Sequence, residues 1–532
     1  MSTAALQHPT APNVHETAHP RRWSILAVLC TSLVVVMIGN SSLNIALPEI
    51  SQVLGASNSQ LQWIVDAYAL VFAGLLFTAG SLGDRFGRKG ALQLGLAIFL
   101  VATVAASTAD SARVLIVCRG AMGFGAAFVM PATLSIIVNV FPTSERAKAI
   151  AIWTAIAGVG GSLGPIASGL LLVHFSWSSV FLVNVPVVVL ALGIGMWVVP
   201  TSRDPGRPGV DPLGALLSTA GIVTLVYAII EAPGRGWTSS ATLGTAFAAF
   251  ALIAAFAGWE LHSAEPMLDL RYFRHAGFAV GSIGVGLVFF ALFGFMFLMT
   301  QYMQMVLGYS PLGASLRMLP FVFVMLAIAP RTPGLVVRLG AQRVVGTGMF
   351  VVAAGMFLVS RLGISTGYAM IATTMVIIAT GMALTMAPLT NSILAGVPRA
   401  KAGIGSAMND TTRELGGALG IAVLGSLVTS QFSSSLSRAL ASLPPQAAAV
   451  ARTSLAGALS VAARMGPAGE ELARAARQAF VDGMSIAVTA GAAVIAVAAV
   501  TALRFLPAQA QEVEATRTDE STEVDELEPA YS

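Results

Sequence analysis

The sequence predicts an all-α protein that crosses a membrane many times, and two observations support this fold class. Of the 532 residues only 10% are charged and 56% are hydrophobic, and the mean hydropathy is +0.80. Soluble domains carry about 25% charged residues. The charged residues of this chain form clusters that separate apolar runs of roughly 18 to 27 residues, which is the length that a helix needs to cross a hydrocarbon layer.

The apolar runs number about fourteen, which predicts about fourteen membrane-spanning helices. A polar tail over residues 1–22 precedes them, an acidic tail over residues 506–532 follows them, and we expect both tails in the cytoplasm. The runs begin near Trp23, Leu61, Gly90, Ala112, Ala149, Ser178, Pro212, Ala241, Phe278, Pro311, Val344, Tyr368, Gly403 and Ala479.

The distribution of Lys and Arg among the short loops predicts the orientation, because cytoplasmic loops retain positive charge. If the N-terminus is inside, sixteen of these residues fall on the inner side and four fall on the outer side, namely Arg113, Arg235, Arg317 and Arg361. Both termini are therefore expected in the cytoplasm. The net charge of +4 reflects this topology, and we expect no nucleic-acid partner.

One segment of the second half departs from the alternation of apolar runs and short loops. Residues 430–478 are rich in Ala and Ser and carry five arginines. We expect an external loop with amphipathic helical pieces. This loop either lies on the outer leaflet and caps the exit path, or it is a solvated linker.

The chain carries no motif for metal binding, redox chemistry or catalysis. Cys30 and Cys118 fall inside apolar runs, where cysteine packs as a small apolar side chain, and the six histidines lack the spacing of metal ligands. The sequence also lacks a nucleophile with a neighbouring base and a phosphate-binding loop. We therefore expect no metal, no cofactor and no enzymatic activity.

A charged turn joins the second and third apolar runs. It places four charges and four glycines in the one charged gap between Tyr68 and Ser107, which favours a gate element over a solvated face. The alternative is that the charges only retain the loop inside the cell. The residues concerned are Gly80, Asp84, Arg85, Gly87, Arg88 and Lys89.

The pattern of this turn, Gly-x-Leu-x-Asp-Arg-x-Gly-Arg-Lys-x-x-Leu, resembles the signature between helices 2 and 3 of the major facilitator superfamily. The resemblance extends over nearly the whole chain. It implies the fold of that family, with a six-helix bundle over residues 23–200, a linker with two extra membrane helices over 201–275 and a second six-helix bundle over 276–505. It also implies alternating access around a cavity at the membrane midplane.

The fifth apolar run carries a second motif, in which Gly160, Gly164, Pro165 and Gly169 follow the pattern Gly-x-x-x-Gly-Pro-x-x-x-Gly. Small residues at this spacing let helices approach closely, and the proline bends the helix. The motif is similar to the antiporter motif of one branch of the family, the drug:proton antiporters with fourteen transmembrane helices. Bacterial multidrug exporters belong to this branch. The resemblance implies a gating role, and glycine-rich packing alone is the alternative.

Two charged residues inside apolar runs of the first half are candidates for proton coupling. Arg119 lies in a segment that resembles the family's buried-arginine motif, and an arginine inside a span must face a partner or water. Asp66 is the matching carboxylate candidate. Burial favours the neutral acid and a nearby arginine favours the charged form, so the pair could load and release a proton. A static salt bridge is the alternative.

The thirteenth apolar run holds the densest polarity within the membrane. Asp410, Arg413 and Glu414 share one helical face through their spacing of three and four residues. Related transporters carry acidic residues at this place, which implies proton or cation handling. The alternative is a self-neutralised cluster that fixes helix packing.

Substrate-binding candidates come from three apolar runs. Along the ninth run aromatic, methionine and polar residues recur at helical spacing, a pattern that fits either an adaptable pocket or ordinary packing. The first run is similar to a branch motif that usually has an acidic residue where this chain has Gly39, so coupling would rest on Asp66, Asp410 or Glu414. The candidates are Asn40, Asn44, Tyr68, Phe293, Met296, Phe297, Thr300 and Gln304.

The resemblance implies a secondary active exporter of amphiphilic or lipophilic, often cationic, compounds by proton antiport, hence multidrug efflux. Its partners would be small amphiphilic molecules, protons and the lipid bilayer of a bacterial plasma membrane. One alternative is a dedicated exporter of one endogenous lipid or antibiotic. Another is a nontransporting membrane receptor or scaffold. The sequence makes no prediction about the oligomeric state.

Overall fold

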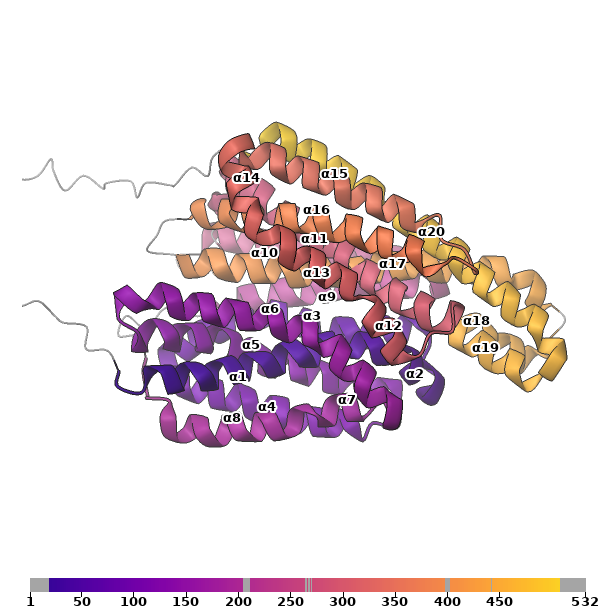
Figure 1. Ribbon diagram of the computed structural model, residues 1–532, viewed down its shortest axis with the longest axis horizontal. Helices are drawn as coiled ribbons and strands as arrows, with labels where there is room; N and C mark the ends of the chain where they lie inside the picture. The colour runs from indigo at the N-terminus through magenta and orange to yellow at the C-terminus, as the bar shows by residue number, and fades with distance from the viewer. Residues whose placement is uncertain are drawn as a thin grey trace, which may run out of the picture.

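The computed structural model describes residues 19–203, 211–263, 266, 268, 270–397, 402–441 and 443–507. Within these residues every regular element is a helix and no strand occurs, which confirms the predicted all-α fold class (Figure 1). Most of the predicted N-terminal tail and nearly all of the predicted acidic C-terminal tail lie outside the described residues.

The first bundle begins with a helix that is broken near its end. Ser42 separates α1 from α2 but keeps helical dihedral angles, and its N–H still donates to the carbonyl of Ile38. In this bundle α3 packs on α5, α4 packs on α5, and α1 packs on α6 and α8. Its helices are α1 Arg22–Ser41, α2 Leu43–Leu54, α3 Asn58–Phe86, α4 Arg88–Ser107, α5 Ala112–Val140, α6 Thr143–His174, α7 Ser179–Leu182 and α8 Asn184–Val198.

Two extra helices, α9 Pro212–Arg235 and α10 Ser240–His262, follow the first bundle and pack on each other. The side chain of Asp211 caps α9 by accepting from the N–H of Gly214, and Ser239 caps α10 in the same way. Helix α9 also packs on α3 and α17, whereas most of α10 is exposed and suited to contact with lipid.

The second bundle contains the longest helices and also the most interrupted one. The tenth apolar run is split into α12, α13 and α14, with prolines at residues 320, 330 and 333, each of which removes a backbone donor. The helices are α11 Ala276–Gln301, α12 Pro311–Arg317, α13 Leu319–Ile328, α14 Thr332–Leu339, α15 Ala341–Val359, α16 Tyr368–Ala395, α17 Ala402–Leu440, α18 Pro445–Thr453, α19 Leu455–Arg464 and α20 Glu470–Phe505.

Thirteen segments of the described residues are helical, long and apolar enough to cross a membrane. They correspond to thirteen of the predicted runs, and the remaining run corresponds to α6, in which Gly164–His174 forms a shorter apolar stretch. The arrangement of two helical bundles with a linking helix pair is visible in Figure 1, where the indigo to magenta helices and the orange to yellow helices lie on opposite sides.

The two ends of the molecule differ in charge. Helix α1 begins and α20 ends at the same end (Figure 1), which also holds Arg22, Arg88 and Lys148, and we call it the basic end. The opposite end carries α18 and α19, which pack on each other. Between residues 430 and 478 the structure places the last turns of α17, these two short helices and the first turns of α20, so little of this segment is irregular.

Candidate functional site

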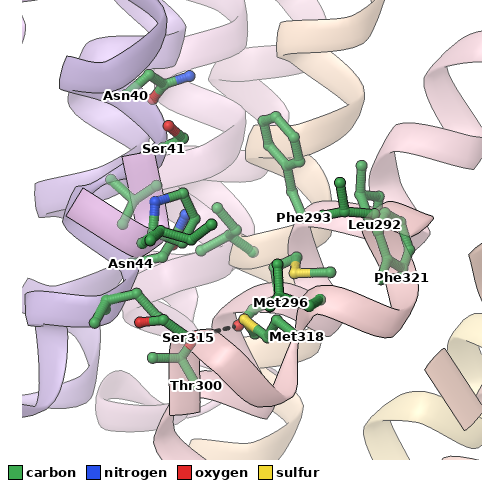
Figure 2. A pocket seen from close by; sticks show the side chains of 17 residues that line it. Asn40, Ser41, Asn44, Leu292, Phe293, Met296, Thr300, Ser315, Met318 and Phe321 are labelled. Atoms are coloured by element: carbon green, nitrogen blue, oxygen red, sulfur yellow. Dashed lines mark hydrogen bonds between the residues drawn. The ribbon is translucent and has the colours of Figure 1, made fainter. Parts of the chain in front are cut away.

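A cavity of about 210 Å³ lies between the two bundles, and seventeen residues line it (Figure 2). The first bundle supplies residues of α1, α2, α3 and α6, and the second bundle supplies residues of α11, α12, α13 and α17. None of the lining residues is charged. The polar lining groups are amides and hydroxyls, so the cavity offers an apolar surface with a few neutral hydrogen-bonding groups.

The first bundle faces this cavity at the break between α1 and α2. Asn40, Ser41 and Asn44 lie along this wall in Figure 2. Helix α6 approaches closely behind them, because a Cβ at Gly164 would lie 3.0 Å from both the Cβ of Ser41 and the backbone nitrogen of Ser42. Gly164 is therefore required for this packing of α6 against α1.

The glycine motif of α6 also joins the two bundles. A Cβ at Gly169 would lie 3.0 Å from the Cα of Leu312 in α12, so α6 and α12 are in close backbone contact there. Pro165, between these glycines, lines the cavity. Gly160 lies in a stretch of α6 whose side-chain surroundings fall outside the described residues.

The second bundle lines the cavity with the predicted face of α11. Phe293, Met296 and Thr300 project into it (Figure 2), and the Thr300 hydroxyl donates to the carbonyl of Met296 at 2.9 Å. Phe297, one position round the helix from Met296, is fully buried and does not line this cavity. Gln304 lies past the end of α11, and its Nε2 donates to the carbonyl of Ile45 at 3.0 Å.

Five of the eight predicted substrate residues thus line the cavity, and the sequence analysis missed the contribution of α12 and α13. Ser315, Met318 and Phe321 come from the interrupted tenth run. The cluster of prolines in that run is the signal that could have identified it, since interrupted helices commonly form the binding sites of transporters. Tyr68, the one predicted substrate residue not yet described, is buried outside this cavity.

Arg119 of α5 is fully buried, and its partners differ from the predicted carboxylate. Its Nε donates to the carbonyl of Ile64 at 3.0 Å, and its Nη1 donates to the carbonyl of Gly39 at 3.1 Å. Its guanidinium carbon lies 4.5 Å from the centre of the Tyr68 ring. Gly39 therefore supplies a backbone acceptor to this arginine.

Asp66 of α3 is fully buried, and neither of its carboxylate oxygens has a hydrogen-bond partner among the described residues. The static salt bridge between Asp66 and Arg119, the alternative to a proton-loading pair, is not formed in the described part of the chain. Helix α17, which carries Glu414, packs against α3, which carries Asp66, so acids of the two bundles lie on contacting helices.

Within the charged cluster of α17, Arg413 contacts both Asp410 and helix α11. The Nη1 of Arg413 lies 3.5 Å from the Oδ1 of Asp410, and its guanidinium carbon lies 4.7 Å from the centre of the Phe289 ring. Glu414 has one carboxylate oxygen buried without a partner in the described part of the chain. Ile421 lines the cavity two turns further along, so Glu414 lies about 10 Å from the cavity along the helix.

The charged turn between α3 and α4 lies at the basic end and contacts the end of α8. The Nε of Arg88 donates to the Oδ1 of Asp84 at 2.6 Å, and Lys89 donates to the carbonyl of Met196 at 2.7 Å. Gly87 has a φ of 131°, which L side chains rarely adopt. Asp84 thus forms an ion pair within its own turn.

Two other residues of this turn have different surroundings. Gly80 lies against α5, since a Cβ there would be 3.4 Å from the Cβ of Pro131. The guanidinium of Arg85 lies 5.6 Å from the centre of the neighbouring Phe86 ring, and Phe86 is exposed.

A cavity enclosed between two bundles of membrane-spanning helices, with buried charges beside it, defines a polytopic membrane protein of the transporter class. The chain belongs to the Major Facilitator Superfamily, whose family model matches residues 29–421. It is a multi-pass membrane protein of this bacterial transporter type.

Several relatives are similar over almost their whole length. The multidrug efflux pump LfrA of Mycolicibacterium smegmatis is 37% identical over 489 residues, which cover 91% of this chain and 96% of the relative. The methyl viologen resistance protein SmvA of Salmonella typhimurium is 34% identical, with 90% of this chain and 97% of the relative covered. The tetracenomycin C resistance and export protein of Streptomyces glaucescens is 32% identical, with 91% of each covered.

A solved structure has the same fold. A bacterial homologue of the human lysosomal transporter Spinster, in an inward-facing and occupied conformation, aligns with a TM-score of 0.67 at 18% identity. The alignment covers 92% of this chain and 98% of that chain.

Proposed function

We propose that this protein is a secondary active exporter of small amphiphilic compounds, driven by proton antiport, and that it acts in multidrug efflux. The observation that carries the proposal is the uncharged cavity that both bundles line, beside the buried carboxylate of Asp66, which does not line it. The names of the relatives, which include a multidrug efflux pump and a methyl viologen resistance protein, support it.

The cavity favours a broad range of substrates over one fixed ligand. Phe293, Met296, Met318 and Phe321 supply aromatic and thioether surfaces that repack around different shapes. Because the lining has no acid, a cationic substrate would be bound there through its apolar part.

Alternating access would be based on the contacts between the bundles. At the opposite end the Nε2 of Gln62 donates to the carbonyls of Ile421 and Ala422 at 3.1 and 3.2 Å, and Asn58 donates to Thr429. We infer that this conformation is closed at the opposite end. The division into bundles over 23–200 and 276–505 remains our prediction for the two moving units.

Proton coupling would use Asp66, Asp410 and Glu414 together with Arg119 and Arg413. Glu414 has a buried carboxylate oxygen without a partner in the described part of the chain, on a helix that packs against α3 of the first bundle. Protonation of Glu414 would remove its charge, so the proton would change the relative energies of the two conformations. Asp66 is buried, and its carboxylate oxygens have no hydrogen-bond partner among the described residues, which leaves them free to take up a proton.

Gating would involve the two glycine motifs and the charged turn. Gly164, Pro165 and Gly169, with Gly160 before them, let α6 slide against α1 and α12. In the outward-facing state the turn of Asp84, Arg85, Arg88 and Lys89 would meet the second bundle, with Gly80 and Gly87 permitting its close approach.

We further propose that the basic end faces the cytoplasm of a bacterial plasma membrane, with both termini inside. A cysteine placed at Arg88 should be protected from an impermeant external thiol reagent in intact cells, and a cysteine placed at Ser454 should be labelled. Cys30 and Cys118 are first replaced by serine. Labelling at residue 88 and protection at residue 454 would reverse the orientation.

The decisive experiment is a flux assay with purified protein in proteoliposomes under an imposed pH gradient. We expect extrusion of several chemically unrelated dyes, and collapse of the gradient should stop it. Flux of a single compound class would identify a dedicated exporter. Binding without any flux would identify a receptor or scaffold and would refute the proposal.

A further inference from the structure

A second hollow lies outside the substrate cavity, on the surface of the second bundle. It is a groove of about 420 Å³ between α11, α15 and α20. Thr501 supplies the one polar side chain among its lining residues, and none of them is charged. The groove is therefore suited to binding a hydrocarbon chain and offers no binding site for a polar substrate.

The groove opens to the outside of the bundle. Ile283 of α11 is 56% exposed, and Val494 and Val497 of α20 are 40% and 68% exposed. In a multi-pass membrane protein these side chains contact lipid. The groove begins near the basic end. Its lining residue on α20 that lies furthest from that end is Ala493, about 16 Å from Arg504 along the helix. That length is about half of a hydrocarbon core about 30 Å thick, so the groove belongs to one leaflet.

Each of the three helices that form the groove carries an arginine at the basic end. Arg274 lies two residues before the start of α11, Arg343 lies in the first turn of α15, and Arg504 lies in the last turn of α20. All three side chains are exposed, and none forms an ion pair with another described residue. The three groove-forming helices therefore each bring a positive charge to the headgroup end of an apolar groove.

We propose that this groove binds one acyl chain of an anionic phospholipid from the leaflet at the basic end, and that Arg274, Arg343 and Arg504 bind its phosphate. The acyl chain packs along α11 and α20 inside the groove. On a flat helix surface the same acyl chain would contact other lipids only. The charge selects the lipid, since basic residues near the membrane surface attract anionic headgroups. This binding requires no transport, so it is independent of the proposed function.

Native mass spectrometry of the purified, delipidated full chain tests the charge component. The protein is titrated with dioleoyl-phosphatidylglycerol and, separately, with dioleoyl-phosphatidylcholine, which has the same chains and no net charge. We expect the anionic lipid to bind at least about tenfold more tightly. The triple variant Arg274→Gln, Arg343→Gln, Arg504→Gln should reduce its binding to the level of phosphatidylcholine. Arg452→Gln, an exposed arginine of α18 at the opposite end, is the control and should leave the preference unchanged.

A second variant tests the groove. Ala493 is exposed and lines it, so Ala493→Phe fills the groove from its open side without disturbing the core. We expect weaker binding of phosphatidylglycerol by at least about fivefold, whereas Ala490→Phe, at an exposed position of α20 outside the groove, should have no effect. Equal binding of the two lipids, or unchanged lipid binding in Ala493→Phe, would overturn the proposal. A change from dimer to monomer in Ala493→Phe with unchanged lipid binding would assign the groove to a second copy of the chain and would also overturn it.

Discussion

The guanidinium carbon of Arg119 lies 4.5 Å from the centre of the Tyr68 ring, and both side chains are buried in the first bundle. A cation over an aromatic face is attracted by the ring's quadrupole, and the attraction grows when water is excluded. Two backbone carbonyls accept hydrogen bonds from this guanidinium, and its buried Nη2 has no partner among the described residues. The arginine thus connects α5 to α3 and α1 without using a carboxylate of its own bundle.

This geometry predicts that Arg119→Lys is not a conservative change. Lysine keeps the charge but has no planar group that lies over Tyr68 while it donates to the carbonyls of Ile64 and Gly39. A buried acceptor left unsatisfied costs about 1–3 kcal/mol. We expect a lower melting temperature and at least about tenfold slower gradient-driven efflux. Arg113→Lys, at an exposed position of the same helix, should match the wild type in both measurements.

A second prediction concerns proton coupling through Asp66. Asparagine has nearly the same size as aspartate but does not titrate, so Asp66→Asn should remain folded and lose efflux driven by a pH gradient. The measurement is dye efflux in proteoliposomes, with thermal unfolding as a check of the fold. Asp110→Asn removes an exposed carboxylate and serves as the control. Wild-type flux in Asp66→Asn would exclude Asp66 as an essential proton carrier.

A third prediction separates two phenylalanines of α11 that the sequence alone treats as equivalent. Phe293 lines the cavity, whereas Phe297 is fully buried outside it. Phe293→Ala should raise the KM for aromatic substrates and change the order of preference among dyes. Phe297→Ala should reduce the free energy of unfolding by about 3–5 kcal/mol and leave the order of preference unchanged. The opposite assignment of effects would place the binding surface on another face of α11.

The fold could be predicted from the sequence because the length of each apolar run is a direct response to the thickness of the bilayer. Thus the expected starts near Pro212, Ala241 and Tyr368 fall within one residue of the observed starts of α9, α10 and α16. The last run is an exception. Helix α20 begins at Glu470 rather than near Ala479, because its polar first turns project beyond the apolar run and pack against α19.

The site was less predictable, because pairing between helices depends on rotations that no single run specifies. Asp66 and Arg119 are suitable partners by chemistry, but the register of α3 and α5 places Tyr68, rather than Asp66, against the guanidinium. Gln304 likewise lies in the π-helical turn Tyr302–Val306, where it donates to the carbonyl of Ile45 instead of lining the cavity. Spacing within one helix was informative, since Phe293, Met296 and Thr300 do share one face.

A fourth prediction concerns the packing of α17 on α11. A Cβ at Gly420 would lie 2.8 Å from the carbonyl carbon of Phe290, and backbone atoms have little freedom to move away. Gly420→Ala should therefore separate the two helices and destabilise the protein by about 1–3 kcal/mol. The melting temperature in detergent measures this effect. Gly244→Ala adds a Cβ into open space on α10 and should not lower it.

The last prediction concerns the contact that closes the opposite end. The Nε2 of Gln62 donates to two backbone carbonyls of α17, and this is possible because Gly425 has no side chain. A Cβ at Gly425 would lie 2.9 Å from the Cδ of Gln62. In Gly425→Ala the amide of Gln62 must therefore move and lose its hydrogen bonds, each worth about 0.5–1.5 kcal/mol. Losing both would shift the equilibrium toward the conformation that is open at the opposite end by about fivefold or more.

We expect longer distances between spin labels placed on α2 and α18, with slower efflux. Gly193→Ala, which meets no atom within 4 Å, should keep the wild-type distances. If Gly425→Ala also keeps them, Gln62 does not contribute to closure of this end.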